Sequence, residues 1–413
     1  MTGGPAADED LPMRTEGQRV RTSKRVENVT YAVREVVDLA HQAAAAGRDM
    51  IYLNIGDPCQ FDFRTPEVVV DAIVRALADG KTGYAPSDGV PEALQAIRRD
   101  AEVRKGIRSV RHVLIGNGAS EPIEILLTAL VDPGESVLIP SPGYPLYSAI
   151  LAKIGARAVS YDLDEDAGWQ PDPQQIARLA DGTTRAVVLI HPNNPTGSVA
   201  SRATLESVLE VAASRRLVVL SDEIYDRMLL DPVEFVSTAS LRDDVPIATF
   251  GGLSKVWLGP GLRMGWSILS GPAVAVEPLH EAMMRLARAR LSASHPVQWA
   301  IRPALEEAHT HIDDVNARLR SRRDLLVREL ERIPGWSLVP PRAAFYAFPR
   351  VEIGVDDETL VRELILEHGV VLVHGSGFGQ LPGTNHARIV FLPPDELIAE
   401  ACRRLADYSA GRG

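Results

Sequence analysis

An alternation of apolar strands and helices between residues 113 and 269 constrains the fold of this chain most. Seven apolar, β-branched runs predict strands, at 113–115, 136–139, 156–161, 186–190, 217–220, 247–250 and 264–269. Segments with helical periodicity separate several of them, at 122–130, 173–179 and 205–213. Nearly continuous apolar strands that alternate with helices indicate a mostly parallel sheet covered on both faces. We therefore expect an α/β fold built around this seven-stranded sheet.

The sequence on either side of the sheet region predicts a different pattern of helices and strands. Before it, we expect a helix over 26–46, a strand at 50–55 and a helix that is capped by Thr65 and ends at Gly80. After about residue 275, a long helical stretch over 278–333 precedes shorter elements that indicate a smaller α+β unit. These are strands at 344–348, 370–373 and 387–391 and a helix at 358–368.

These changes in the predicted secondary structure divide the 413 residues into four parts. Residues 1–22 are polar and predict a mobile tail, and residues 23–64 form a segment that joins the small domain. Residues 65–284 are expected to form the large domain, and residues 285–413 the small domain.

Charge and cysteine content exclude several classes of function. The net charge of −11 disfavours non-specific nucleic-acid binding, which depends on Lys and Arg. The two cysteines, Cys59 and Cys402, form no disulfide framework and favour a reducing compartment, and no Cys/His cluster has the spacing of a metal site. The N-terminus lacks the pattern of a signal peptide, and no run of about 18 apolar residues occurs. We therefore expect a cytoplasmic protein without a metal.

The glycine loop Gly116-Asn117-Gly118-Ala119-Ser120 lies between a predicted strand and a predicted helix. Glycines let backbone N–H groups approach an anion, and the start of a helix adds partial positive charge. A dinucleotide-binding fingerprint would need a third glycine at position 121, where the chain has Glu121. The loop therefore favours phosphate over a nicotinamide dinucleotide, and a tight turn without any ligand remains the alternative.

Two polar segments follow the next strands. The stretch HPNNPTG (191–197) follows the strand at 186–190, and SDEIY (221–225) follows the strand at 217–220. Ligands of α/β sheets bind at the carboxyl ends of the strands. Burial of Asp222 would be costly unless a cation faces it. A rigid Asn-Pro turn and an aspartate that caps a helix are the alternatives.

A lysine and an arginine lie near the ends of the last two strands. The stretch GGLSK (251–255) resembles a phosphate-binding loop, but its spacing is wrong and Val256 follows Lys255 instead of Ser or Thr. A lysine at this edge can act as an amine nucleophile toward an aldehyde. Taken alone, a surface lysine is the favoured interpretation. Arg263 follows in the stretch GLRMG (261–265).

All four motifs are predicted at one edge of one sheet, so their side chains can meet in one crevice. The set combines a phosphate cradle with Asp, Asn, Tyr, Lys and Arg. A phosphorylated pyridine aldehyde needs such a set, with an amine for a Schiff base and an anion opposite the ring nitrogen.

With these motifs, the sequence resembles the class I aminotransferases of the aspartate aminotransferase superfamily, which have pyridoxal-phosphate fold type I. Within them it is most similar to the alanine aminotransferases of prokaryotes and archaea. The resemblance extends from about Arg21 to Tyr408. The segments that carry it are LNIGDP (53–58), PNNPTG (192–197), SDEIYD (221–226), GLSK (252–255), AFYAFP (344–349), HGSGFG (374–379) and ARIVFLPP (387–394).

The resemblance implies a role for each matching residue. Lys255 would bind the coenzyme aldehyde and move the substrate proton, and Asp222 would pair with the ring nitrogen. Asn194 and Tyr225 would hydrogen-bond the phenolic oxygen of the ring. The remaining implied contacts are phosphate binding by Ala119, Ser120, Ser254 and Arg263, ring stacking by Tyr144, phosphate binding in the neighbouring subunit by Tyr84, and substrate carboxylate binding by Arg388, Asn194 and Gly56.

The implied activity is a homodimeric, pyridoxal-phosphate-dependent aminotransferase that works by a ping-pong Schiff-base mechanism. The expected amino donor is an L-amino acid such as alanine, and the expected acceptor is a 2-oxo acid such as 2-oxoglutarate. A transaminase, lyase or decarboxylase of specialised biosynthesis and, more remotely, a non-catalytic effector-sensing module are alternatives. Gly251 and Leu262 depart from the residues common in the family and bear on specificity.

For several other residues, a structural role is the alternative to a role in binding. A structural ion pair is the alternative for Arg388. Phe345 and Tyr346 fit core packing as well as substrate contact. A solvated helix face is favoured over a second carboxylate site for the arginines Arg285, Arg288 and Arg290.

Overall fold

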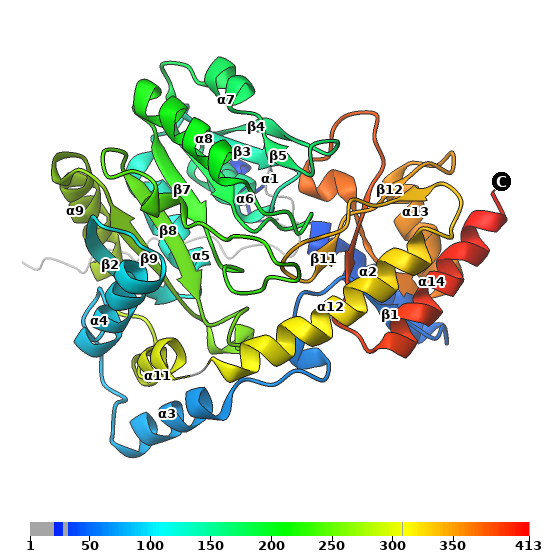
Figure 1. Ribbon diagram of the computed structural model, residues 1–413, viewed down its shortest axis with the longest axis horizontal. Helices are drawn as coiled ribbons and strands as arrows, with labels where there is room; N and C mark the ends of the chain where they lie inside the picture. Colours follow the sequence, from blue (N-terminus) through cyan, green and yellow to red (C-terminus); the bar gives the residue numbers. More distant parts are fainter. Residues whose placement is uncertain (1–19, 28–31, 308, 413) are drawn as a thin grey trace, which may run out of the picture.

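The computed structural model describes residues 20–27, 32–307 and 309–412. Its largest element is an eight-stranded sheet with the order β2-β9-β8-β7-β6-β3-β4-β5 (Figure 1). The strands are β2 (Val110–Asn117), β3 (Ser136–Ser141), β4 (Arg157–Asp164), β5 (Gln170–Pro171), β6 (Thr184–Ile190), β7 (Val218–Asp222), β8 (Ile247–Gly252) and β9 (Met264–Ser270).

The sheet is mostly parallel, which confirms the predicted α/β fold. Neighbouring strands from β4 through β3, β6 and β7 to β8 pair in parallel, whereas β9 is antiparallel to both β8 and β2. The seven predicted strands are all present. The eighth, β5, pairs antiparallel with β4 at the edge of the sheet. Its two residues are too few to show the alternation by which strands are recognised.

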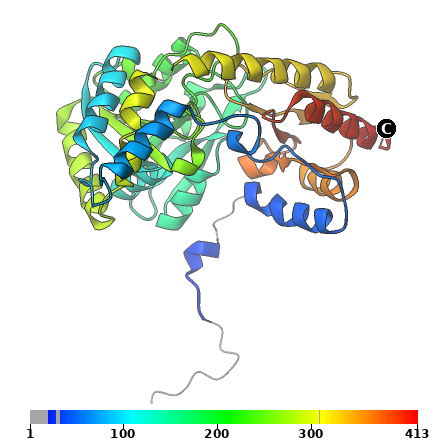
Figure 2. The same ribbon diagram turned by 90° about the horizontal axis from the view of Figure 1, so that it is seen from below.

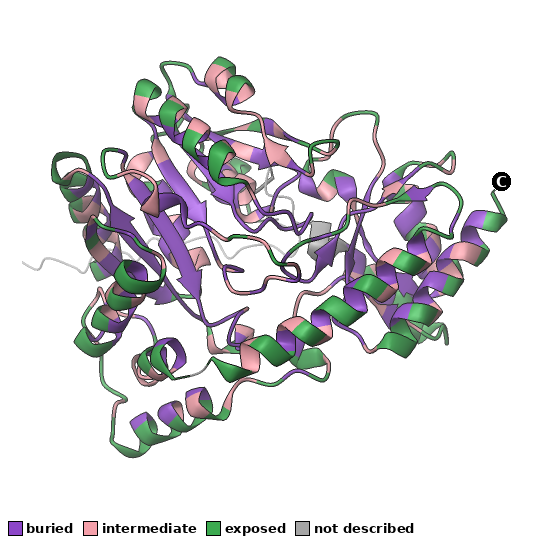
Figure 3. Cartoon of the chain, in the orientation of Figure 1, coloured by how far each residue is buried: buried purple, intermediate pink, exposed green. Residues whose placement is uncertain are grey.

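Helices cover both faces of the sheet, and its strands are the most buried part of the chain (Figure 3). Side chains such as Leu126 and Met283 pack α5 and α9 against one face, together with α6. The other face packs against α4, α7 and α8. These helices are α4 (Pro91–Arg99), α5 (Ser120–Leu130), α6 (Leu146–Ile154), α7 (Pro173–Leu179), α8 (Arg202–Arg215) and α9 (Ala273–Ala289).

A smaller unit combines the C-terminal third with residues near the N-terminus. It contains a three-stranded sheet in the order β11-β15-β14, and β1 pairs in parallel with β13. Helix α12 extends from the large sheet region into this unit (Figures 1 and 2). The elements are α2 (Ala32–Ala45), β1 (Ile51–Tyr52), α12 (Thr310–Leu330), β10 (Trp336–Ser337), β11 (Tyr346–Ala347), β12 (Arg350–Val351), α13 (Asp357–Glu363), β13 (Val370–Val371), β14 (Val373–His374), β15 (Ala387–Val390) and α14 (Asp395–Ala410).

Several predicted boundaries were wrong. The stretch 278–333 is not one helix: α9 is followed by α10 (His295–Gln298), α11 (Ile301–Glu306) and α12. The strand predicted at 50–55 is only β1. Thr65 is no helix cap, because Pro66 precedes α3 (Glu67–Ala78) and the Thr65 hydroxyl instead donates a 2.8 Å hydrogen bond to the carbonyl of Leu258.

The N-terminal helix prediction corresponds to α1 (Lys24–Glu27) and α2, and residues 28–31 between them lie outside the described residues. Most of the predicted tail, residues 1–19, also lies outside them. The domain boundaries at residues 65 and 285 stay a prediction. Within the described ranges, no helix combines the length and the apolar character that a membrane crossing requires.

Candidate active site

A cavity of about 460 Å³ lies at the carboxyl edge of the large sheet, where the N-terminal segment and the small unit meet it. The loops after β2, β3, β6, β7 and β8 all reach it, as does the start of the antiparallel strand β9. Every site residue that the sequence singled out lines the cavity except Tyr84. They are Gly56, Ala119, Ser120, Tyr144, Asn194, Asp222, Tyr225, Ser254, Lys255, Arg263 and Arg388.

One end of the cavity is built to hold an anion. Helix α5 begins at Ser120, so its first backbone N–H groups face the cavity mouth. Arg263 lies against Gly118, where an added Cβ would be only 2.3 Å from a guanidinium nitrogen. The same guanidinium donates a 3.3 Å hydrogen bond to the hydroxyl of Ser120. A helix start, two serines (Ser120 and Ser254) and an exposed guanidinium thus line the same cavity, a set of groups that suits a phosphate.

A buried carboxylate and an amine line the same cavity. Asp222 ends β7 and is 5% exposed. Burial raises its pKa to about 6, although a 3.1 Å hydrogen bond from the hydroxyl of Tyr147 opposes the rise. The ammonium of Lys255 donates a 2.8 Å hydrogen bond to the carbonyl of Gly56. A cationic ring nitrogen near Asp222 would stabilise the ionised form of this buried carboxylate beyond the effect of Lys255.

Two phenols meet beside Asp222. The hydroxyls of Tyr225 and Tyr346 are 3.0 Å apart and buried. Burial, and then the neighbouring Tyr346 phenol, hold the pKa of Tyr225 well above its ordinary value. Tyr225 therefore remains a protonated phenol that can donate a hydrogen bond to a ligand oxygen.

Arg388 projects from β15 and is 2% exposed. Its guanidinium donates hydrogen bonds to the backbone carbonyl of Asn54 and, at 3.3 Å, to the side-chain oxygen of Asn194. The rings of Tyr346 and Phe378 lie 4.9 and 4.7 Å from it. These contacts fix a planar cation inside the cavity, where it suits a carboxylate.

Three further residues from the sequence analysis have the following positions. Tyr84 is 83% exposed and lies outside the cavity. Tyr346, left undecided between core and substrate contact, lines it. Arg290 instead packs into the protein, because it donates to the carbonyl of Ile115 and pairs with Glu121.

Sequence reasoning missed Tyr147 and part of the cavity wall. Tyr147 bonds Asp222 from α6, and a second tyrosine three residues after Tyr144 was the available signal. Val37 and Gln60 line the cavity from the N-terminal segment, where no motif marked them, and Ile55 does so from the LNIGDP stretch, in which only Gly56 was given a role. No cluster of metal-binding side chains occurs among the residues that the structure describes.

The observed donor set fits a phosphorylated aromatic aldehyde. The start of α5 together with Ser254 and Arg263, here called the anion cradle, is complementary to its phosphate. The carboxylate of Asp222 is complementary to its ring nitrogen, the phenol of Tyr225 to its ring oxygen and the amine of Lys255 to its aldehyde. Arg388 adds a second cation to the cavity, and this cation suits the carboxylate of a substrate.

Comparisons with known proteins agree with this chemistry. Residues 48–405 match the family model "Aminotransferase class I and II". The chain is 39% identical over 399 residues to an alanine aminotransferase of Mycobacterium tuberculosis, covering 94% of this chain and 92% of that protein. It is 35% identical to a glutamate-pyruvate aminotransferase of Escherichia coli, covering 95% and 98% of the two chains. The solved alanine aminotransferase of Pyrococcus furiosus superimposes with a TM-score of 0.91 at 37% identity, over 95% of this chain and 100% of that one.

Proposed function

Since this chain belongs to the class I and II aminotransferases, we propose that it uses pyridoxal phosphate to transfer an amino group from alanine to 2-oxoglutarate. The printed names of its relatives, alanine aminotransferase and glutamate-pyruvate aminotransferase, support this substrate pair. The single observation that best supports this coenzyme is that Lys255, Asp222 and the anion cradle all line one cavity.

Pyridoxal phosphate supplies an aldehyde that reacts with amines and a ring that accepts electrons when a Cα–H bond breaks. In this proposal, the residues at the start of α5 together with Ser254 and Arg263 hold the phosphate, and Tyr144 packs on the ring. Asp222 keeps the ring nitrogen protonated, while Asn194 and Tyr225 hydrogen-bond the ring oxygen. Lys255 carries the proton to and from the substrate Cα.

Arg388 binds the substrate α-carboxylate, assisted by Asn194 and the backbone of Gly56. The position of the Tyr346 phenol favours a small substrate. Its hydroxyl packs so closely on Gly56 that an added Cβ there would lie only 2.2 Å from it, so the cavity is closed at this point. A short side chain such as the methyl group of alanine suits this narrow wall.

A panel of amino and 2-oxo acids with purified, coenzyme-loaded protein tests the function. We expect alanine and 2-oxoglutarate to give pyruvate and glutamate with the largest kcat/KM, at least about tenfold above that of a branched or aromatic donor. Product identification by mass spectrometry is the measurement. Release of carbon dioxide or ammonia without amino transfer would favour the lyase alternative, and transfer only from a larger donor would contradict the substrate assignment.

We also propose a homodimer in which Tyr84 reaches the phosphate bound in the neighbouring subunit. The 83% exposed phenol of Tyr84, outside its own cavity, supports this assignment. The two free cysteines, Cys59 and Cys402, support a cytoplasmic location, where thiols stay reduced.

Mixing two defective variants tests the shared site. Random exchange of Tyr84→Ala and Lys255→Ala subunits yields hybrid dimers in which one of two sites has both wild-type residues. Because half of the dimers are hybrids, activity should recover to about a quarter of the wild-type value. Recovery no greater than the mean of the two separate variants would contradict the contribution of Tyr84 to its neighbour, and a monomer in sedimentation would contradict the dimer itself.

A further inference from the structure

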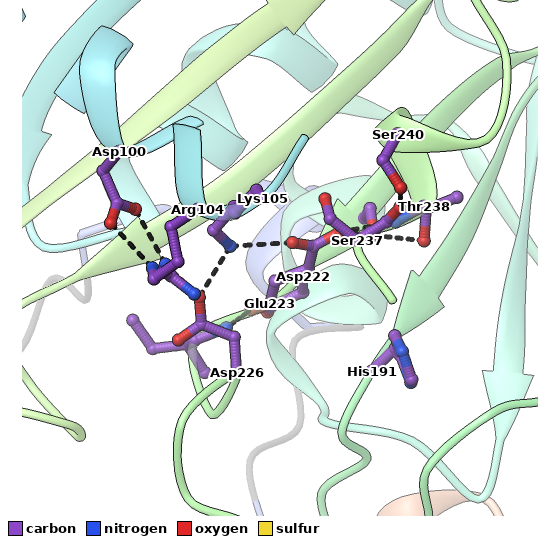
Figure 4. Close-up of polar contacts among 12 residues, drawn as sticks. Asp100, Arg104, Lys105, His191, Asp222, Glu223, Asp226, Ser237, Thr238 and Ser240 are labelled. Atoms are coloured by element: carbon purple, nitrogen blue, oxygen red, sulfur yellow. Dashed lines mark hydrogen bonds and ion pairs between the residues drawn. The ribbon is translucent and has the colours of Figure 1, made fainter. Parts of the chain in front are cut away.

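A cluster of buried charges lies directly behind the cavity wall and has no part in the function proposed so far. The ammonium of Lys105 is 2.7 Å from a carboxylate oxygen of Glu223 and 2.8 Å from one of Asp226. Figure 4 shows Lys105 between these two side chains. The Lys105 side chain is 5% exposed, Glu223 is 0% exposed and Asp226 is 7% exposed. Such a buried arrangement is costly unless every charge is paired.

Glu223 and Asp226 have further partners besides Lys105. The second oxygen of Glu223 accepts hydrogen bonds from the hydroxyls of Ser221 and Ser237 and from the backbone N–H of Thr238. Asp226 also accepts a 2.8 Å hydrogen bond from Arg104. Burial opposes the ionisation of Asp226, but the charges of Lys105 and Arg104 outweigh it and hold the pKa of Asp226 below its ordinary range.

The cluster continues to the surface as alternating charges. Arg104 forms two 2.7 Å hydrogen bonds with Asp100, and Asp100 accepts another, of 2.9 Å, from Arg227. Lys105, Arg104 and Arg227 thus face an equal number of carboxylates. Lys105 itself directly follows the helical turn η2 (Asp100–Arg104), which is far from β7 in the sequence.

The two carboxylates that Lys105 pairs with alternate along the chain with two residues of the cavity. Asp222 and Tyr225 line the cavity, whereas Glu223 and Asp226 turn inward to Lys105. A single ammonium therefore fixes both ends of the short turn that presents the carboxylate and the phenol. We propose that Lys105 is a positioning residue, which holds Asp222 and Tyr225 in the geometry required by the coenzyme through Glu223 and Asp226.

The positive charge of Lys105 also affects the pKa of Asp222, through Glu223. The negative charge of Glu223 contributes to the raised pKa of Asp222, after burial, which is the main cause. Lys105 offsets that negative charge. Its removal should therefore raise the pKa of Asp222 further, so that a smaller share of Asp222 is ionised at neutral pH in the coenzyme-free protein.

The proposal rests on the proposed pyridoxal-phosphate function, and the variant Lys105→Met tests it. Methionine keeps most of the side-chain volume and removes the charge. We expect coenzyme affinity, measured by quenching of tryptophan fluorescence when coenzyme-free protein is titrated, to fall about tenfold. The value of kcat/KM for alanine should fall about 10- to 100-fold, because small misplacements of reacting groups are costly.

Two further variants separate positioning from general damage to the fold. Lys105→Arg keeps a cation for both carboxylates and should restore most of the coenzyme affinity, and failure to exceed Lys105→Met would count against the proposal. Lys153→Met removes an exposed lysine paired with Glu124 on the surface and should behave as wild type. Native circular dichroism and cooperative urea unfolding establish that each variant is folded.

Lys105→Met leaves Glu223 without an ion pair and leaves Asp226 paired with Arg104 alone, so Lys105→Met/Glu223→Gln replaces that variant if it does not fold. The double variant carries no additional uncompensated charge, and we expect its coenzyme affinity to remain at least about threefold below wild type, since Asp226 has still lost its ion pair with Lys105. Wild-type affinity and kcat in a folded Lys105 variant without a cation would overturn the proposal. Wild-type protein that binds no pyridoxal phosphate would instead overturn the proposed function.

Discussion

Lys255→Ala is expected to abolish amino transfer, lowering kcat by at least about 10⁴-fold. The reason is chemical, because alanine has neither an amine to bind an aldehyde nor a base to move the Cα proton. In the structure the Lys255 side chain lies in the cavity and its ammonium bonds the carbonyl of Gly56. Reduction of the coenzyme-loaded protein with borohydride, followed by peptide mass spectrometry, should label Lys255 in the wild type and leave the variant unlabelled.

The variant should still fold and still bind the coenzyme non-covalently, since the anion cradle and Asp222 remain. Dialysis should therefore remove the coenzyme from Lys255→Ala faster than from the wild type. Lys153→Ala, at an exposed position on α6, is the matched control and should keep wild-type activity and labelling. An active Lys255→Ala protein, or labelling at a different lysine, would refute the assignment of the reacting amine.

The sheet and the main chemistry of the site followed from local sequence patterns. Asp222 ends β7 and Lys255 lies three residues after the end of β8, and parallel strands bring their carboxyl ends to one edge. The antiparallel direction of β9 places Arg263, at its start, on that same edge. These positions depend on the strands alone, so a prediction of the strands was sufficient to group the residues.

Other parts of the site depend on packing between distant segments. The contact of Lys105 with Glu223 joins residues 118 positions apart, and no motif marks either as a partner. Tyr147 was missed for the same reason, since only the docking of α6 on the sheet brings it to Asp222. The division of 278–333 into several helices was also missed, because the Ala-, Arg- and Leu-rich parts favour a helix and the interruption by Ser292, Ser294 and Pro296 was not weighed.

The second large effect is expected at Asp222, where Asp222→Asn should lower kcat about 10³-fold. Asparagine is nearly the same size but carries no negative charge, so it cannot hold the ring nitrogen of the coenzyme protonated. The electron-accepting capacity of the ring then falls, while Lys255 remains available to bind the aldehyde. Steady-state kinetics should therefore show a loss in kcat together with retained borohydride labelling of Lys255. Retained kcat would contradict the proposed pairing with the ring nitrogen.

The same substitution has a signature in the coenzyme-free protein. Burial raises the pKa of Asp222 from 3.8 to about 6 in the folded state, so the folded protein binds this proton more tightly than the unfolded chain. The resulting stabilisation is fully present below about pH 4 and is lost as the pH rises through about 6. Between pH 4 and pH 7, the free energy of unfolding of the wild type should therefore fall by about 2 kcal/mol relative to Asp222→Asn.

Urea unfolding of both proteins across this pH range measures the difference, and taking the difference removes the contributions of all other titrating groups. Bound coenzyme should abolish most of the pH dependence, because a protonated ring nitrogen stabilises the carboxylate in the folded protein. An equal pH dependence in the two coenzyme-free proteins would show that Asp222 is not the buried acid described above. A pH dependence that persists unchanged in the loaded protein would place the positive charge of the coenzyme elsewhere in the cavity.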